Sequence, residues 1–176
     1  MKPLFIGTVG VITNSLAEGR TLYVDAIGLP LAQAKGTNFL HSEKLEGCKY
    51  FGVWPLSEAA RTCFGDESWP AGRPIPQMFV EFEMDSPRSV KVAASELESK
   101  GYTLIHGART DPWGQTVARL QTVDGLLVGV SYVPWMHRRA KAKSKAATPS
   151  RRRWSLLASR ASRVQRQDLM WDARDR

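Results

Sequence analysis

The sequence predicts an α+β domain built from two similar halves. Signals for a strand, a helix and then several strands occur in this order, and the order returns in the second half of the chain. A segment rich in proline and glycine, residues 66–76, has the composition of a linker between the halves. The last predicted strand of each half also contains a similar short motif, since Phe51-Gly-Val-Trp-Pro55 resembles Val128-Gly-Val-Ser-Tyr-Val-Pro134. We therefore expect one module over residues 3–65 and a second over residues 77–136.

The first half begins with a strand and a helix. Residues 4–13 are rich in β-branched side chains, which favour a strand. Ser15 then has the position of an N-cap, and Gly28 supplies a left-handed stop for the helix between them. After a stretch without clear periodicity, residues 49–54 predict another strand, which Pro55 closes.

The second half repeats this order more clearly. Residues 78–84 predict a strand, and Ser86 followed by Pro87 is a typical helix start. Gly101 ends that helix. Three further strands are expected, the last two joined by an Asp-Gly hairpin turn, over residues 102–106, 115–123 and 126–133.

Charge divides the chain into a domain and a tail. The net charge of +8 arises from residues 137–176, which carry 13 basic and three acidic residues, whereas residues 1–136 carry 12 basic and 14 acidic residues. We expect the domain to end at residue 136 and the basic tail to be disordered or weakly helical. Such a tail could bind nucleic acid or an anionic surface by neutralising phosphates, without reading bases.

Three short segments give the chain a family resemblance. Ile27-Gly28-Leu29 ends the first helix, Asp111-Pro-Trp-Gly-Gln115 precedes the penultimate strand, and Val123-Asp-Gly-Leu-Leu-Val128 follows it. With the order of elements, these segments resemble the vicinal oxygen chelate superfamily, which includes glyoxalase I, bleomycin-resistance proteins and extradiol dioxygenases. The resemblance implies two βαβββ modules whose mixed sheet curls into a cup, and a homodimer. It does not fix the chemistry, because this fold hosts many reactions.

The resemblance also identifies four positions where metal-dependent members hold a divalent ion. They fall at Thr8, Gly52, Phe79 and Gly129. Glycine and phenylalanine side chains cannot ligate a metal, and one threonine cannot hold it alone. We therefore expect no metal and no cofactor, as in the bleomycin-resistance branch, which works by binding. A register shift of one or two residues would bring Glu81 or Glu83 to a ligand position.

Two glutamates share a face with Phe79. The period of two along a strand places Phe79, Glu81 and Glu83 on one side, which faces the cup if Phe79 does. They could line a solvated rim or pair with Arg119 or Arg109. Alternatively, they could make the cup acidic and suited to a cationic guest, or one could serve as a catalytic base.

Aromatic and small residues complete the expected ligand site. Six tryptophans are many for 176 residues, and Trp54, Trp69 and Trp113 belong to segments that border the cup. Flat rings there would stack on an organic ligand, although core packing is the alternative role. Gly52 and Gly129 would leave room for the ligand beside Thr8.

These observations favour a metal-independent protein that binds a small organic molecule, with a cationic ligand as one option. The first alternative is a glyoxalase-like lyase or isomerase with Glu81 or Glu83 as the base. The second is a binder of nucleic acid or anionic surfaces through the tail. Cys48 and Cys63 form no disulfide framework, which favours the cytoplasm, and the apolar run at residues 126–136 is too short to span a membrane.

Overall fold

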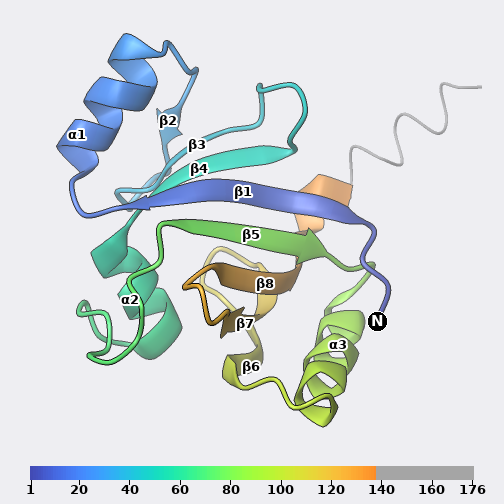
Figure 1. Cartoon of the computed structure of the whole chain (residues 1–176). Coiled ribbons are helices and arrows are strands. Elements are labelled where there is room, and N and C mark those ends of the chain that lie inside the picture. Colours follow the sequence, from blue (N-terminus) through green and yellow to red (C-terminus); the bar gives the residue numbers. More distant parts are fainter. Residues whose placement is uncertain (138–176) are drawn as a thin grey trace, which may run out of the picture. The chain divides into compact units, whose positions relative to one another are not determined.

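The computed structural model describes residues 1–137 and confirms the predicted α+β fold (Figure 1). The first module contains β1 (Phe5–Thr13), α1 (Leu16–Arg20) with a π-helical continuation (Thr21–Ala26), β2 (Ala32–Gln33), β3 (Leu40–Ser42), β4 (Tyr50–Pro55) and α2 (Leu56–Phe64). The second contains β5 (Met78–Glu83), α3 (Pro87–Ser99), β6 (Leu104–Thr110), β7 (Thr116–Gln121) and β8 (Leu127–Tyr132). Apart from His137, the predicted basic tail lies outside the described residues.

All the strands form one mixed sheet in the order β2-β3-β4-β1-β5-β8-β7-β6. β1 pairs with β5 in antiparallel fashion at the centre, so the two modules join within one chain. β1 also pairs with β4, and β5 with β8, both in parallel. Because parallel neighbours need a crossover, each module carries its helix between these strands.

The strand registers show that the modules are related by a pseudo-two-fold axis. Gly10 faces Gly52 across β1 and β4, and Glu81 faces Gly129 across β5 and β8. Gly10 of the first module is thus equivalent to Glu81 of the second, and by the same alignment Thr8 is equivalent to Phe79. The short motif shared by the two halves of the sequence therefore occupies equivalent positions in the two modules, as a duplicated module requires.

Helix α2 is an element that the sequence did not predict. It follows Pro55 directly and buries Ala59, Ala60 and Cys63. Gly65 ends it with a φ of 82°, in the left-handed region that glycine tolerates best. The helix packs on the inner face of the sheet and closes one end of the cup, where it joins an apolar cluster that includes Ile12, Trp54, Phe79 and Leu127.

Helix α3 packs on the opposite, outer face. Its N-cap Ser86 accepts a hydrogen bond from the backbone of Ser89, and Val90, Ala93 and Ala94 are buried. These side chains contact Ala118 and Val130 of β7 and β8. The domain thus has one apolar cluster on each face of the sheet.

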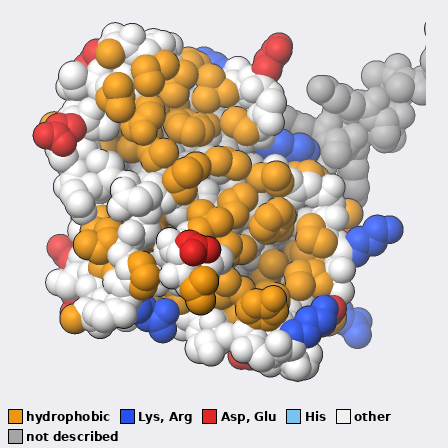
Figure 2. All heavy atoms as spheres, viewed as in Figure 1, with side chains coloured by type: hydrophobic (Ala, Val, Ile, Leu, Met, Phe, Trp, Pro, Cys, Tyr) orange, Lys and Arg blue, Asp and Glu red, His pale blue; other side chains and the backbone are white. Residues whose placement is uncertain are grey.

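The outer face of β1 and β5 is apolar and partly open to solvent. Ile6 and Met78 are 49% and 44% exposed. They lie on the side of the strands opposite to Thr8 and Glu81. Figure 2 shows apolar side chains spread over this face. Within residues 1–137, no helix is both long and apolar enough to cross a bilayer.

Candidate ligand-binding site

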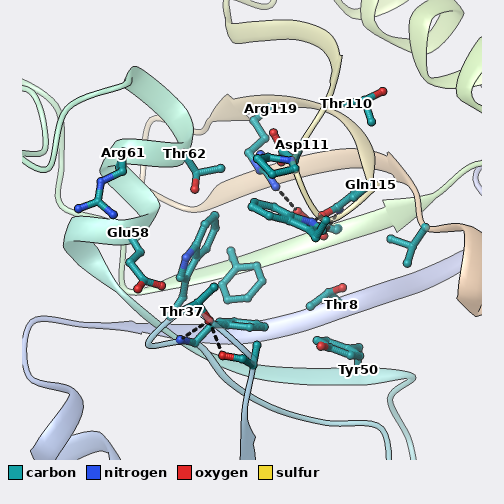
Figure 3. Close-up of a pocket in the computed structure, with 18 of the residues that line it drawn as sticks. Thr8, Thr37, Tyr50, Glu58, Arg61, Thr62, Thr110, Asp111, Gln115 and Arg119 are labelled. Atoms are coloured by element: carbon teal, nitrogen blue, oxygen red, sulfur yellow. Dashed lines mark hydrogen bonds and ion pairs between the residues drawn. The ribbon is translucent and has the colours of Figure 1, made fainter.

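A cavity of about 680 Å³ lies on the inner face of the sheet (Figure 3). This volume is within the usual range for sites that hold a small organic molecule. Its lining comes from both modules and from the turn after β8, and the members used below are Thr8, Tyr50, Trp54, Phe79, Glu81, Asp111, Trp113, Gln115, Arg119 and Trp135.

The floor contains a row of neighbouring residues on five strands. Tyr50 faces Thr8, Thr8 faces Glu81, Glu81 faces Gly129, and Gly129 faces Arg119. Side chains opposite one another in a sheet point to the same face, so this row brings hydroxyl, carboxylate and guanidinium groups together. The strand alternation in the sequence determines the face, and the pairing order determines which groups meet.

Arg119 is the charged centre of this row. It is only 2% exposed, and its Nη2 lies 2.9 Å from Glu81 Oε1 while its Nη1 lies 3.1 Å from Asp111 Oδ2. Gln115 Nε2 donates to the second Glu81 oxygen at 2.7 Å. Burial alone would lower the pKa of Arg119, but the charge of Glu81, assisted by Cys63 and Asp111, outweighs it and raises that pKa. The guanidinium therefore stays charged, and pairing with Arg119 was one of the predicted alternatives for Glu81.

Gly129 makes this ion pair sterically possible. A Cβ at this position would lie 3.0 Å from Glu81 Cγ and 3.3 Å from Val117 Cγ2. Arg119 on β7 reaches Glu81 on β5 across the intervening strand β8. A side chain on β8 would stand in that path, so glycine is required there for packing.

Aromatic rings form the walls above the floor. Trp54 and Phe79 meet edge to face at 5.3 Å between centroids, and Phe39 stacks on Tyr50 at 6.2 Å. Trp113 donates its indole N–H to Gln115 Oε1 at 2.8 Å, which fixes its ring beside the cavity. Burial raises the pKa of Tyr50, so its hydroxyl remains protonated.

The positions implied for a metal do not fit one. A Cβ at Gly52 would lie 2.4 Å from the Phe39 ring, and one at Gly129 would lie 3.0 Å from Glu81 Cγ. At Gly10, which pairs with Gly52 in the sheet, a Cβ would lie 2.3 Å from the Phe79 ring. The room expected over Gly52 is therefore filled by a ring. Among residues 1–137, no group of three or more His, Cys, Asp or Glu side chains could hold an ion.

Glu83 lies away from the cavity that Glu81 lines. The strand pattern predicts that both carboxylates face the cup, and they do share a face, but Glu83 is fully buried and does not line the cavity. It accepts hydrogen bonds from Ser131 Oγ at 2.5 Å and from the Val133 amide at 2.9 Å, and its Oε2 lies 2.9 Å from His137 Nε2. Glu83 therefore anchors the C-terminal turn that carries Trp135.

The other predicted residues divide into two groups. Thr8, Trp54, Phe79, Glu81 and Trp113 line the cavity. The backbones of Gly52 and Gly129 lie in the same rows of the sheet but do not line it.

Sequence reasoning missed other members of the site. Tyr50, Asp111, Gln115 and Trp135 were not singled out, although Asp111 and Gln115 bound the segment that carried the resemblance. Nucleophilic chemistry by Cys63 is disfavoured, because burial raises its pKa to about 11 and keeps the thiol protonated at neutral pH.

Comparisons with known proteins show the fold. No protein-family model and no curated protein matches the chain. Streptomyces coelicolor methylmalonyl-CoA epimerase matches with a TM-score of 0.50 and 13% identity, covering 76% of this chain and 96% of that one. A hypothetical protein from Bacillus halodurans also gives a TM-score of 0.50, with 15% identity over 73% of this chain and 94% of that one.

A superfamily member from Vibrio splendidus, described as a glyoxalase/bleomycin resistance protein/dioxygenase, gives a TM-score of 0.48 and 13% identity. It covers 73% of this chain and 100% of its own. The likenesses at a TM-score of 0.50 support the vicinal oxygen chelate fold that the sequence resemblance implied.

Proposed function

We propose that this chain, which has the vicinal oxygen chelate fold, binds a small organic molecule in the inner-face cavity without a metal ion. The observation that carries the proposal is the composition of the cavity, whose walls are aromatic rings and whose floor charges are paired with one another. Phe39 and Phe79 fill the space over Gly52 and Gly10. Such a site favours desolvation and stacking of a ligand.

A glyoxalase-like lyase or isomerase is the second candidate. Only Glu81 could then be the base, because Glu83 does not line the cavity. Each Glu81 oxygen already accepts a hydrogen bond, one from Arg119 and one from Gln115. Taking a proton from a substrate would compete with these bonds, which favours binding over proton abstraction.

Native mass spectrometry of the purified full chain, with metal analysis, tests the proposal. We expect a non-covalently bound organic molecule and no stoichiometric metal. Trp54→Phe should reduce ligand occupancy because Trp54 lines the cavity. Trp69→Phe is the matched control, since Trp69 packs against Phe64 and does not line the cavity. Stoichiometric zinc, nickel or iron, or equal occupancy in both variants, would contradict the proposal.

A further inference from the structure

The charges on the floor of the cavity form one paired group, in which Glu81, Asp111 and Arg119 are buried and Arg109 is partly exposed. Glu81 and Asp111 both contact Arg119, and Arg109 Nε lies 3.5 Å from the second Asp111 oxygen. Two carboxylates therefore face two guanidiniums. Because Arg119, Glu81 and Asp111 are nearly excluded from solvent, an additional charge among them would be poorly compensated.

A charged ligand would compete with these pairs. A cation would have to take Glu81 from Arg119, and an anion would have to take Arg119 from its two carboxylates. Breaking a buried pair leaves a charge without compensation, which is strongly unfavourable in proteins. The floor of the cavity thus disfavours the charged group of a cationic ligand, which was one option from the sequence.

On the floor of the cavity, the polar groups still open to a ligand are able to donate. Arg119 donates one N–H from each terminal nitrogen to a carboxylate, and its remaining N–H groups have no acceptor within residues 1–137. In the same part of the chain, the hydroxyls of Thr8 and Tyr50 have no hydrogen-bond partner, and both residues line the cavity. The oxygens of Glu81 each have a donor already.

The walls beside these donors are flat. The Arg119 guanidinium lies 5.5 Å from the Trp54 ring centroid, and Trp54 in turn contacts Phe79. Figure 3 shows Arg119 and Thr8 on opposite sides of the group of aromatic rings. An aromatic ligand that carries an acceptor oxygen would match both features, since its rings would stack while the oxygen meets a donor.

We propose, resting on the binding function above, that the cavity selects uncharged aromatic carbonyl compounds. The carbonyl oxygen accepts a hydrogen bond from Arg119 or from the Thr8 and Tyr50 hydroxyls, and the rings of Trp54 and Phe79 hold the aromatic part. Selection against charge at the floor comes from the Glu81–Arg119–Asp111 network, whose charged groups are already paired with one another. Lys35, Glu58 and Arg61 also line the cavity, but they come from the segment after β2 and from α2, not from the floor.

A matched set of naphthalene probes tests this inference on the full chain. The probes are 2-naphthamide, 2-naphthoate and 2-naphthamidine, which share shape but are neutral, anionic and cationic, with 2-methylnaphthalene as the probe without a carbonyl. Calorimetric titration should give a Kd for 2-naphthamide about tenfold or more below that of each other probe. Tyr50→Phe should weaken the binding of 2-naphthamide by about threefold to tenfold and leave the binding of 2-methylnaphthalene unchanged.

Some results would overturn only the selectivity inferred here, and one would also overturn the proposed binding function. A Kd for a charged probe equal to or below that of 2-naphthamide would overturn the selection against charge but not the proposed binding function. Equal binding of 2-methylnaphthalene would overturn the role of the carbonyl. Weakening in Trp69→Phe but not in Trp54→Phe would place the probes outside the cavity and overturn the inference. Absence of saturable binding by every probe would overturn both proposals.

Discussion

At the scale of single residues, the pair formed by Glu81 and Arg119 depends on the absence of a side chain at Gly129. A methyl group there would lie 3.0 Å from Glu81 Cγ, and Glu81 is held by two donors. We expect Gly129→Ala to lower the free energy of unfolding by about 1–3 kcal/mol through overpacking. Urea denaturation measures this change.

Gly107→Ala is the control for that substitution. Gly107 also lies in a strand, but no heavy atom lies within 4 Å of the point that a Cβ would occupy there, and its φ is not positive. Alanine at this position should leave stability unchanged or raise it slightly. Equal destabilisation by both substitutions would contradict the role assigned to Gly129.

The sequence predicted part of the site because strands alternate with a period of two. That rule placed Phe79 and Glu81 on one face, as the structure does. Arg119, which pairs with Glu81, was among the partners expected for the glutamates. The rule could not separate Glu81 from Glu83, since both share that face. The two glutamates differ in their surroundings because they lie at different positions along β5, and residues of the C-terminal turn cover Glu83. This contact joins positions 50 or more apart in sequence, so no local pattern encodes it.

At the scale of elements, β6 carries a histidine that should make stability depend on pH. His106 Nδ1 lies 2.9 Å from the Gly107 carbonyl oxygen, and its Nε2 is buried without a hydrogen-bond partner in the described part of the chain. Burial, assisted by the charges of Arg119 and Arg109, lowers the pKa of His106 to about 4, against an opposing contribution from the Gly107 hydrogen bond. The folded protein therefore favours the neutral ring.

The sign of the effect follows from proton binding. Between about pH 6.5 and 4 the unfolded chain protonates His106 while the folded chain does not, so stability falls as pH decreases through this window. Because the ring is only partly buried, we expect the loss to be about 1–2 kcal/mol. Denaturation curves at pH 7 and pH 4.5 should differ less in His106→Gln than in the parent. Equal pH dependence in both would contradict this expectation.

Helix α2 shows why one element escaped prediction. It has nine residues and follows a proline, so local signals are weak and an isolated helix of this length would be marginal in water. Its stability comes from burying Ala59, Ala60 and Cys63 against the inner face. The longer strands and α3, by contrast, have caps, hairpin turns and periodic apolar positions that can be recognised from sequence. The short strands β2 and β3, of two and three residues, also escaped prediction.

At the scale of the whole molecule, the open outer face of β1 and β5 bears on the expected homodimer. Ile6 and Met78 are half exposed on this apolar face, and a two-fold pairing of chains would bury both copies of it. We propose that two chains associate through it, and we expect sedimentation velocity to show dimers. Ile6→Glu should shift the population to monomers, because it would place charge within the interface.

Val92→Glu is the control, since Val92 is 57% exposed on α3. This substitution adds the same charge away from β1 and β5 and should leave the dimers intact. A monomeric parent chain, or equal dissociation by both substitutions, would contradict association through this face.

The side chains packed over Gly52 and Gly129 also constrain how this protein could change over evolutionary time. A ligating side chain introduced at Gly52 would meet the Phe39 ring, and one at Gly129 would meet the side chains of Glu81 and Val117. Each first step toward a metal site would therefore damage packing before a second step could supply another ligand. Acquiring a metal site would take several coordinated substitutions, so the present arrangement opposes its evolution by single mutations.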